Sequence, residues 1–499
     1  MAKTNSIIIL AIIITGLTLP YLMYVYLPTQ IERSLVSNLN DQVRNRLGAA
    51  TIILEDKEGN RIPSTPVQIS PSSLDFILGA GVWTTTAVQS WTESDWNYYR
   101  SAGFEYEQIW TTWRLIQPTQ NQFNFSSVQG QIDYVRAHNP HAKFFARLQG
   151  IVPDPLVGDS LNDSTPPAFT NFTSSIPSDP TAYLNQVRIY VRTLVSKYAG
   201  QIDVWVTPIE INRIDYATTA FNLPTPPWTL QDAVQIDRVI VDAVKEGDPN
   251  ATLVLGTSTP LSPYEGNSET RVDPIVFEQM AITAGVTFDE VAVEAYAFSG
   301  DISFWFRYLA EMSNLGRPIF INEAGISSEG FDYVKLQSAR EAQDAWYQDL
   351  LTLSLAMKPI VGVFLLEFKD RIVQARYSQF ENMGLVDSSG QPKPSYSGIR
   401  SILQQLTQLN QTTSPDGQVS VGLLAGNYML HANEFEGQFR IVEGTNRTYI
   451  MQTGSNGQLQ ISIATSSTLP LNSIETEQLG TQVVAWAGAA LNSKRNTRW

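Results

Sequence analysis

Two glutamates lie at the ends of strongly apolar segments, where a charged side chain is unexpected. Glu210 closes "QIDVWVTPIE", and Glu323 lies near the end of "RPIFINEAG". Burying a lone carboxylate is costly, so this placement indicates either an opening to water or a catalytic use. Cleavage of a glycosidic bond requires two carboxyl groups across a pocket, one protonated and the other ionised. Glu210 and Glu323 are therefore predicted to be catalytic.

Other side chains near the ends of apolar segments could contact a sugar through a flat ring, an amide or a charge. The predicted substrate-binding residues are Trp113, Arg147, Asn212, Tyr296 and Glu367. The aromatic residues among them have a plainer alternative, because an aromatic ring is more often a packing residue. Arg147 could instead pair with one of the two glutamates, and Glu367 could belong to an ordinary ion pair.

Eight short apolar segments alternate with amphipathic helical segments between residues 76 and 409, and they must position these side chains. The predicted strands are 76–83, 104–113, 142–150, 201–210, 252–260, 288–298, 317–325 and 361–370. Eight such units predict an α/β fold, a (β/α)8 TIM barrel, with functional side chains at the C-terminal ends of the strands. A doubly wound sheet is the alternative, but no GxGxxG follows the first predicted strand.

Composition excludes several classes of partner and chemistry. The 48 acidic residues outnumber the 33 basic ones, giving a net charge of −15 and no basic face for nucleic acid. The chain has no cysteine, and its three histidines are too scattered to predict a metal centre. We therefore expect a polysaccharide or oligosaccharide substrate, no cofactor, no metal and no nucleic-acid partner. The oligomeric state stays open.

The two ends of the chain predict accessory units. Residues 6–27 are uncharged and apolar over about the thickness of a bilayer, so 1–29 is predicted to be an uncleaved membrane anchor with the body outside the cell. Secretion after signal cleavage is the alternative. Residues 30–75 are predicted to form a stalk helix and a small β-hairpin around Gly59. Residues 410–499 alternate between apolar and polar positions and predict a small β domain.

Several motifs follow one another in an order that resembles a known group of enzymes. They are "GFEYEQIWTTWRLIQPTQNQFNF", "YAGQIDVWVTPIEIN", "RPIFINEAGISSE" and "ENMGLVDSSGQPKPSYSGI". Together, over about residues 50–405, they resemble clan A of the retaining glycoside hydrolases, and most closely the family ten endo-β-xylanase-like barrels. The resemblance implies that Glu210 is the general acid/base, that Glu323 is the nucleophile, and that Tyr296 hydrogen-bonds the nucleophile. The chain departs from the pattern at Ile209, where most clan members have an asparagine.

Two functions follow from these observations. The first is a membrane-anchored extracytoplasmic glycoside hydrolase that cleaves β-O-glycosidic bonds with retention. It predicts carboxyl groups about 5–5.5 Å apart. The alternative is a catalytically impaired glycan-binding or cell-envelope scaffold protein on the same barrel, which the departure at Ile209 would favour. The sugar, the linkage and the choice between internal and terminal cleavage stay open.

Overall fold

The computed structural model describes residues 39, 42–81, 91–152, 165–172, 180–216, 218, 225–261, 266–329, 339–370, 380–433, 435–453 and 459–468. The apolar segment predicted to anchor the chain, and most of the predicted stalk, lie outside these residues. Within the described ranges, no helix combines the length and the apolarity needed to cross a bilayer.

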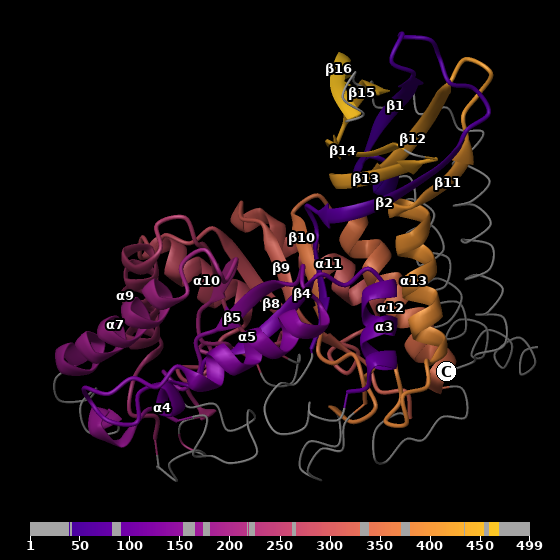
Figure 1. Ribbon diagram of the computed structural model, residues 1–499. Coiled ribbons are helices and arrows are strands. Elements are labelled where there is room, and N and C mark those ends of the chain that lie inside the picture. The colour runs from indigo at the N-terminus through magenta and orange to yellow at the C-terminus, as the bar shows by residue number, and fades with distance from the viewer. Residues whose placement is uncertain are drawn as a thin grey trace, which may run out of the picture.

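Eight parallel strands close into the predicted barrel (Figure 1). In order around the barrel they are β3 (Ile77–Ala80), β4 (Tyr106–Trp110), β5 (Lys143–Arg147), β6 (Val204–Val206), β7 (Thr252–Leu255), β8 (Glu290–Tyr296), β9 (Ile319–Gly325) and β10 (Ile360–Leu365), which pairs with β3. Each lies within a predicted strand or differs from it by a residue. The C-terminal ends of all eight strands therefore meet at one rim.

Helices connect the strands and cover the outside of the barrel. They are α3 (Glu93–Ser101), α4 (Trp113–Ile116), α5 (Ser126–His138), α7 (Pro180–Lys197), α9 (Leu230–Gly247), α10 (Pro274–Thr283), α11 (Ile302–Met312), α12 (Ala339–Ala356) and α13 (Pro394–Thr407), with the short 3-10 turns η3 (Ala168–Thr170) and η4 (Ser313–Leu315). In α9, Thr229 and Asp232 form a reciprocal cap at the N-terminus. The buried residues of α9 recur at helical spacing, which turns one face toward the barrel.

The barrel interior is filled with side chains below the rim. Phe145 packs edge-on against Phe320 at 5.5 Å and against Phe364 at 4.6 Å between ring centroids. Ile209 joins this interior cluster and is 4% exposed. The barrel is therefore a packed core, and a substrate can reach polar groups only at the rim.

A second domain lies at the end of the barrel opposite the rim (Figure 1). One sheet has the order β12 (Gln418–Leu424), β1 (Leu47–Glu55), β15 (Thr445–Thr453), β16 (Leu459–Thr468). The other has the order β11 (Leu409–Thr412), β2 (Pro66–Leu74), β13 (Gly426–Ala432), β14 (Phe435–Ile441). Strands from the two ends of the described chain are thus paired in the same sheets.

The predicted β-hairpin around Gly59 is wrong, although a turn does form there. Asp56 accepts hydrogen bonds from the backbone of Glu58 and Asn60, and Gly59 takes a φ of +85°. Beyond one bridge between Glu55 and Arg61 the two arms separate, β1 into one sheet and β2 into the other. Prolines at 63 and 66 cannot donate ladder hydrogen bonds, which accounts for the separation.

Arg46 joins this second domain to the base of the barrel. Its guanidinium donates to the carbonyls of Met357 at 2.6 Å, Lys358 at 2.8 Å and Ile360 at 2.6 Å, between the end of α12 and the start of β10. Arg46→Met is expected to lower the free energy of unfolding by about 3 kcal/mol, because buried carbonyls lose their donor. Denaturant titration measures this. Lys358→Ala, at an exposed ion pair, is the control, and an equal loss in both variants would contradict the assignment.

A buried carboxyl group between the barrel and its helices is expected to make the stability of the protein depend on pH. Asp237 on α9 is fully buried, and burial raises its pKa well above the usual range while Thr207 opposes the shift. The unfolded chain ionises it near pH 4, so its contribution to stability is complete below that pH and is lost as pH rises toward the folded-state pKa.

Asp237→Asn is therefore expected to raise the free energy of unfolding at pH 7 by about 1 kcal/mol or more, since one pKa unit corresponds to about 1.4 kcal/mol. The gain should vanish near pH 4. Denaturant titration at the two pH values measures it, with Asp242→Asn on the exposed side of the same helix as the control. An equal change in both variants, or a gain that persists at pH 4, would contradict this account.

Candidate active site

Glu323 reaches the rim through an irregularity in the sheet. Between β8 and β9 the register shifts, so Val293 pairs with Ile321 but Glu294 pairs with Glu323, and Asn322 is passed over. A bulge of this kind turns the next side chain to a new direction. Ile321 and Ala324 pack in the core around the barrel, whereas Glu323 is 7% exposed at the C-terminal end.

Two donors hold the Glu323 carboxylate. Arg147, from the end of β5, forms an ion pair with Oε1, and the Tyr296 hydroxyl donates to Oε2. The second Arg147 nitrogen donates to the Asn322 carbonyl at 2.8 Å, so the arginine binds the carboxylate through one nitrogen only. Charge-assisted hydrogen bonds of this type stabilise a carboxylate and fix its orientation. The hydrogen bond from Tyr296 is the one that the resemblance implies.

Tyr296 remains a donor because its own ionisation is disfavoured. Burial, followed by the charges of Glu323 and Glu294, raises the Tyr296 pKa well above its usual range. Gly325 gives the ring its room, since a Cβ there would collide with the Met383 sulfur and crowd the tyrosine. The phenol is therefore protonated and directed at Glu323.

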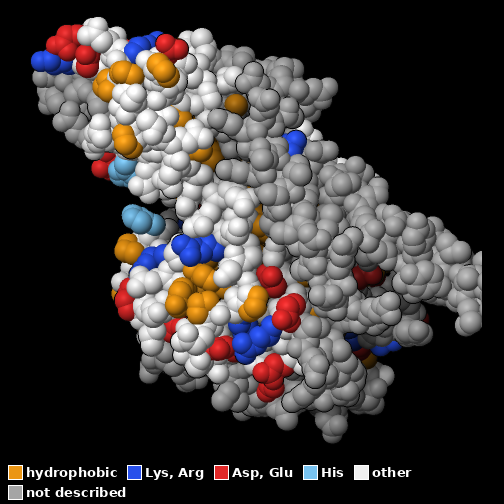
Figure 2. All heavy atoms as spheres, turned by 90° about the vertical axis from the view of Figure 1, so that its right-hand side faces the viewer, with side chains coloured by type: hydrophobic (Ala, Val, Ile, Leu, Met, Phe, Trp, Pro, Cys, Tyr) orange, Lys and Arg blue, Asp and Glu red, His pale blue; other side chains and the backbone are white. Residues whose placement is uncertain are grey.

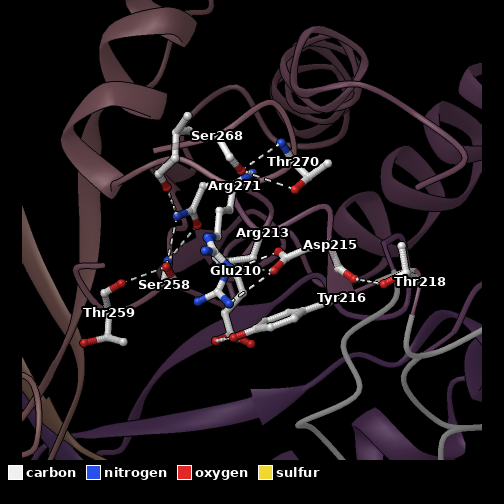
Figure 3. A network of polar contacts seen from close by, with 12 residues as sticks. Glu210, Arg213, Asp215, Tyr216, Thr218, Ser258, Thr259, Ser268, Thr270 and Arg271 are labelled. Atoms are coloured by element: carbon white, nitrogen blue, oxygen red, sulfur yellow. Dashed lines mark hydrogen bonds and ion pairs between the residues drawn. The ribbon is translucent and has the colours of Figure 1, made fainter. Parts of the chain in front are cut away.

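Glu210 lies four residues beyond the end of β6, on a turn. It takes a φ of +57°, and its carbonyl accepts from the backbone N–H of Arg213 at 2.8 Å. Glu210 is 8% exposed, and the Tyr216 hydroxyl donates to Oε1 at 3.3 Å (Figure 3). Glu210 therefore belongs to the rim as predicted, but a turn positions it and not the strand itself.

Asn212 clamps this turn to the neighbouring segments. Its amide nitrogen donates to Ser258 Oγ at 2.9 Å and to the Val272 carbonyl at 2.7 Å, and its oxygen accepts from the Ser258 N–H at 3.0 Å. Asn212 is fully buried. Its predicted contact with substrate is thus corrected: the amide is occupied by the fold, and its effect on the site is to hold the turn that carries Glu210.

A charged cluster beside Glu210 was not predicted from the sequence. Arg213 pairs with Asp215 through Nε at 3.2 Å, and Arg271 approaches the same carboxylate at 3.8 Å (Figure 3). The Arg213 guanidinium also lies 4.6 Å from the centre of the Tyr216 ring. The cluster orients the tyrosine that contacts Glu210. Its only sequence signal is the density of polar residues in "NRIDY" directly after Glu210.

Trp113 and Glu367, both predicted to bind substrate, lie in the interior. The Trp113 indole donates to Gln117 Oε1 at 2.8 Å and stacks on Tyr190 at 4.9 Å, without exposure. β4 ends at Trp110, so Trp113 already belongs to α4 and turns under the rim. Glu367 is also fully buried, so its predicted contact with substrate is corrected, and the ion pair of Lys393 is with Asp370 at 2.7 Å.

One wall of the rim is aromatic. Phe298, two residues beyond Tyr296, stacks on that ring at 4.9 Å and 9° between planes, and Phe380 meets Tyr296 at 5.3 Å. Neither phenylalanine was predicted from the sequence. The signal for Phe298 was its place two residues after Tyr296, in "YAF" at the end of the predicted strand.

The described charged side chains on one face of the molecule are mixed in sign. On the face in Figure 2, basic and acidic side chains lie beside one another. Among the residues that the structure describes, no three His, Asp or Glu side chains are grouped so that they could hold a metal ion.

Comparison by sequence finds no matching family model and no matching curated protein. Solved structures do match. A GH5_18 enzyme from Streptomyces cattleya, in complex with Manb1-4GlcNAc, gives a TM-score of 0.51 at 15% identity, over 66% of this chain and 80% of that one. Xylanase 10B from Thermotoga petrophila RKU-1, in complex with xylobiose, gives 0.47 at 15% identity, over 66% and 94%. Exo-beta-1,4-mannosidase Op5Man5 from Opitutaceae bacterium strain TAV5 gives 0.47 at 16% identity, over 70% and 60%.

The match to the GH5_18 enzyme shows that the barrel fold is shared. That shared fold confirms, at the level of fold, the resemblance expected from the sequence motifs. This similarity of fold does not assign a role to any individual residue.

Proposed function

We propose that the protein is a retaining glycoside hydrolase that cleaves β-O-glycosidic bonds of a polysaccharide or oligosaccharide. The observation that carries the proposal is the Glu323 carboxylate, nearly buried at the barrel rim and held by Arg147 and Tyr296. A carboxylate fixed by two donors is suited to attack at one carbon. Glu210 stands at the same rim and supplies the second carboxyl group that the reaction requires.

The two glutamates have separate tasks in this proposal. Glu323 attacks the anomeric carbon while protonated Glu210 gives its proton to the leaving oxygen, so the glycosidic bond breaks as a glycosyl ester forms. Glu210, now ionised, takes a proton from water, and that water attacks the same carbon and releases Glu323. Two inversions leave the configuration retained. The separation of about 5–5.5 Å between carboxyl groups that this requires stays a prediction.

A glycan-binding protein without turnover is the second candidate. It would be favoured if an arginine bound either glutamate through both carboxylate oxygens, which makes a closed and static pair. Arg147 instead gives one nitrogen to Glu323 and the other to the Asn322 carbonyl, and Tyr296 takes the second oxygen. This geometry favours an oriented nucleophile over a closed ion pair.

Hydrolysis tests the proposal. The purified protein is incubated with a panel of β-linked polysaccharides and aryl glycosides, and the first-formed product is identified by NMR. We expect release of sugar whose anomeric configuration is initially β. Initial release of the α anomer would contradict the retaining mechanism, and no release from any substrate by the folded protein would favour the glycan-binding alternative.

We further propose that residues 1–29 anchor the chain in the membrane with the barrel on the extracytoplasmic side, on the apolar run from 6 to 27 alone. Protease added to intact cells should then cleave the barrel, and alkaline extraction should leave the chain in the membrane fraction. Release into the medium of a chain lacking these residues would instead support secretion after cleavage.

A further inference from the structure

A buried lysine in the motif "ENMGLVDSSGQPKPSYSGI" joins three segments of the chain near the rim. Lys393, directly before α13, is 2% exposed. Its ammonium group donates to Asp370 Oδ1 at 2.7 Å, to Ser328 Oγ at 2.9 Å and to the Asn382 carbonyl at 3.0 Å. An ammonium group has three donors, so all of them are used. Ser328 and Asp370 follow the ends of β9 and β10.

Hydrogen bonds from this network fix the backbone on both sides of Met383. The Asn382 carbonyl before it accepts from the buried lysine, and the Met383 carbonyl accepts from the Tyr347 hydroxyl at 2.7 Å. The Gly384 N–H after it donates to Asp370 Oδ1 at 2.8 Å. A Cβ at Gly384 would collide with the Asp370 backbone, so glycine permits this approach. A buried polar network whose groups are satisfied specifies one arrangement of the chain.

The Met383 side chain connects this network to the candidate nucleophile. It is fully buried and forms a small apolar cluster with Tyr296 and Leu366. Its sulfur and the Tyr296 ring both adjoin Gly325, where an added Cβ would meet them. The Tyr296 hydroxyl in turn donates to the Glu323 carboxylate. Met383 is therefore one side chain away from the carboxylate that Tyr296 orients.

We propose that Lys393 and Met383 are positioning residues for the nucleophile Glu323. The lysine fixes the backbone around Met383, and the Met383 side chain holds the Tyr296 phenol in line with the carboxylate. The inference rests on the proposed hydrolase function and deepens it. A phenol that can tilt donates a less linear hydrogen bond, and such bonds weaken steeply. The effect is expected in the rate of the chemical step and not in substrate binding, because neither residue contacts the substrate.

Kinetics of Met383 variants of the full-length protein test the proposal. Met383→Ala is expected to lower kcat about tenfold with KM unchanged, since small misplacements of reacting groups are costly. Met383→Leu, which keeps the volume, should retain most of the rate. In the Tyr296→Phe background no hydroxyl remains to be oriented, so Met383→Ala should change kcat by less than about twofold. Met312→Ala, at a fully buried methionine at the end of α11, should lower stability but keep kcat.

A paired substitution tests the lysine. Lys393→Met together with Asp370→Asn removes both charges, so neither is left buried without compensation. The asparagine keeps an oxygen for the Gly384 N–H, but the Asn382 carbonyl loses the ammonium group. The paired variant is expected to lower kcat with KM unchanged, and to do so only when Tyr296 is present. An unchanged kcat would remove Lys393 from the proposal.

Fluorine NMR reads the phenol without substrate. The full-length protein is produced with 3-fluorotyrosine, and Tyr296→Phe identifies the Tyr296 resonance by its loss. We expect Glu323→Gln, Met383→Ala and the paired variant each to shift this resonance. Met312→Ala should leave it in place.

The outcomes separate the positioning role from the proposed function. If the wild type hydrolyses its substrate and Met383→Ala has the same effect with and without the Tyr296 hydroxyl, the positioning role is overturned alone. If the wild type hydrolyses nothing, the proposed function fails and the resonance decides: an unmoved signal in Met383→Ala overturns the positioning too, and a shifted one supports it. If Met383→Ala does not fold, the smaller truncation Met383→Val takes its place with the same expectations.

Discussion

Replacing Glu323 by glutamine is expected to lower kcat by about 10⁴-fold or more, the scale on which removal of a nucleophile acts. Glutamine keeps the shape of the side chain and can still face Arg147 and Tyr296, so the fold should persist. The loss would then come from the missing nucleophilic oxygen and not from unfolding. Initial rates on the best substrate of the panel, with circular dichroism of the same samples, measure it.

Glu294→Gln is the matched control for this substitution. Glu294 is the register partner of Glu323 on the adjacent strand and is 4% exposed. The substitution Glu294→Gln therefore removes a carboxylate close to Glu323. We expect it to reduce the rate far less than Glu323→Gln does. Comparable losses in the two variants would mean that any nearby negative charge suffices, and the assignment of Glu323 as nucleophile would fail.

Replacing Arg147 by methionine is expected to destabilise the protein by about 3–5 kcal/mol, because breaking a buried ion pair leaves the other charge without compensation. Arg147 is fully buried, and the Glu323 carboxylate is nearly so. Activity should fall as well, since the carboxylate loses one of the two groups that orient it. Denaturant titration gives the free energy of unfolding.

A second substitution separates the charge effect from loss of packing. Glu323→Gln removes the charge that Arg147→Met would strand, so the double variant is expected to recover most of the lost stability. If Arg147→Met costs the same with Glu323 and with glutamine at that position, the two side chains are not coupled. The ion pair would then have no part in holding the site.

The barrel and the position of Glu323 were predictable because both depend on local patterns. A short apolar run bounded by polar residues indicates a buried parallel strand, and eight such runs indicate the closed barrel. The rule that functional groups gather at the C-terminal ends then selects Glu323, Arg147 and Tyr296. These three side chains do meet in the structure.

The errors at the rim come from residues that follow a strand rather than end it. Trp113 and Asn212 lie beyond the last strand residues Trp110 and Val206. There the turn, and not the alternation of side chains along a strand, determines where a side chain points. The Trp113 side chain points below the rim into the core, and the Asn212 side chain hydrogen-bonds the neighbouring segment at Ser258. Predicting either would require the dihedral angles of the turn, which residue types alone do not determine.

In the second domain, too, residue types did not determine the arrangement, here the pairing of strands far apart in the sequence. Alternation identified the strands on both sides of the barrel segment but not their partners. β1 pairs with β12 and β15, and β2 with β11 and β13, across more than three hundred residues of chain. Phe298 was missed for a related reason, because an exposed aromatic and a packed one look alike in sequence.

Trapping the glycosyl–enzyme tests directly whether Glu323 is the nucleophile. The protein is incubated with activated 2-fluoro glycosides of the sugars it hydrolyses, then digested, and the labelled peptide is sequenced by mass spectrometry. We expect one covalent glycosyl group, attached to Glu323. A label on any other residue, or an unlabelled enzyme whose hydrolysis the reagent does not slow, would contradict it.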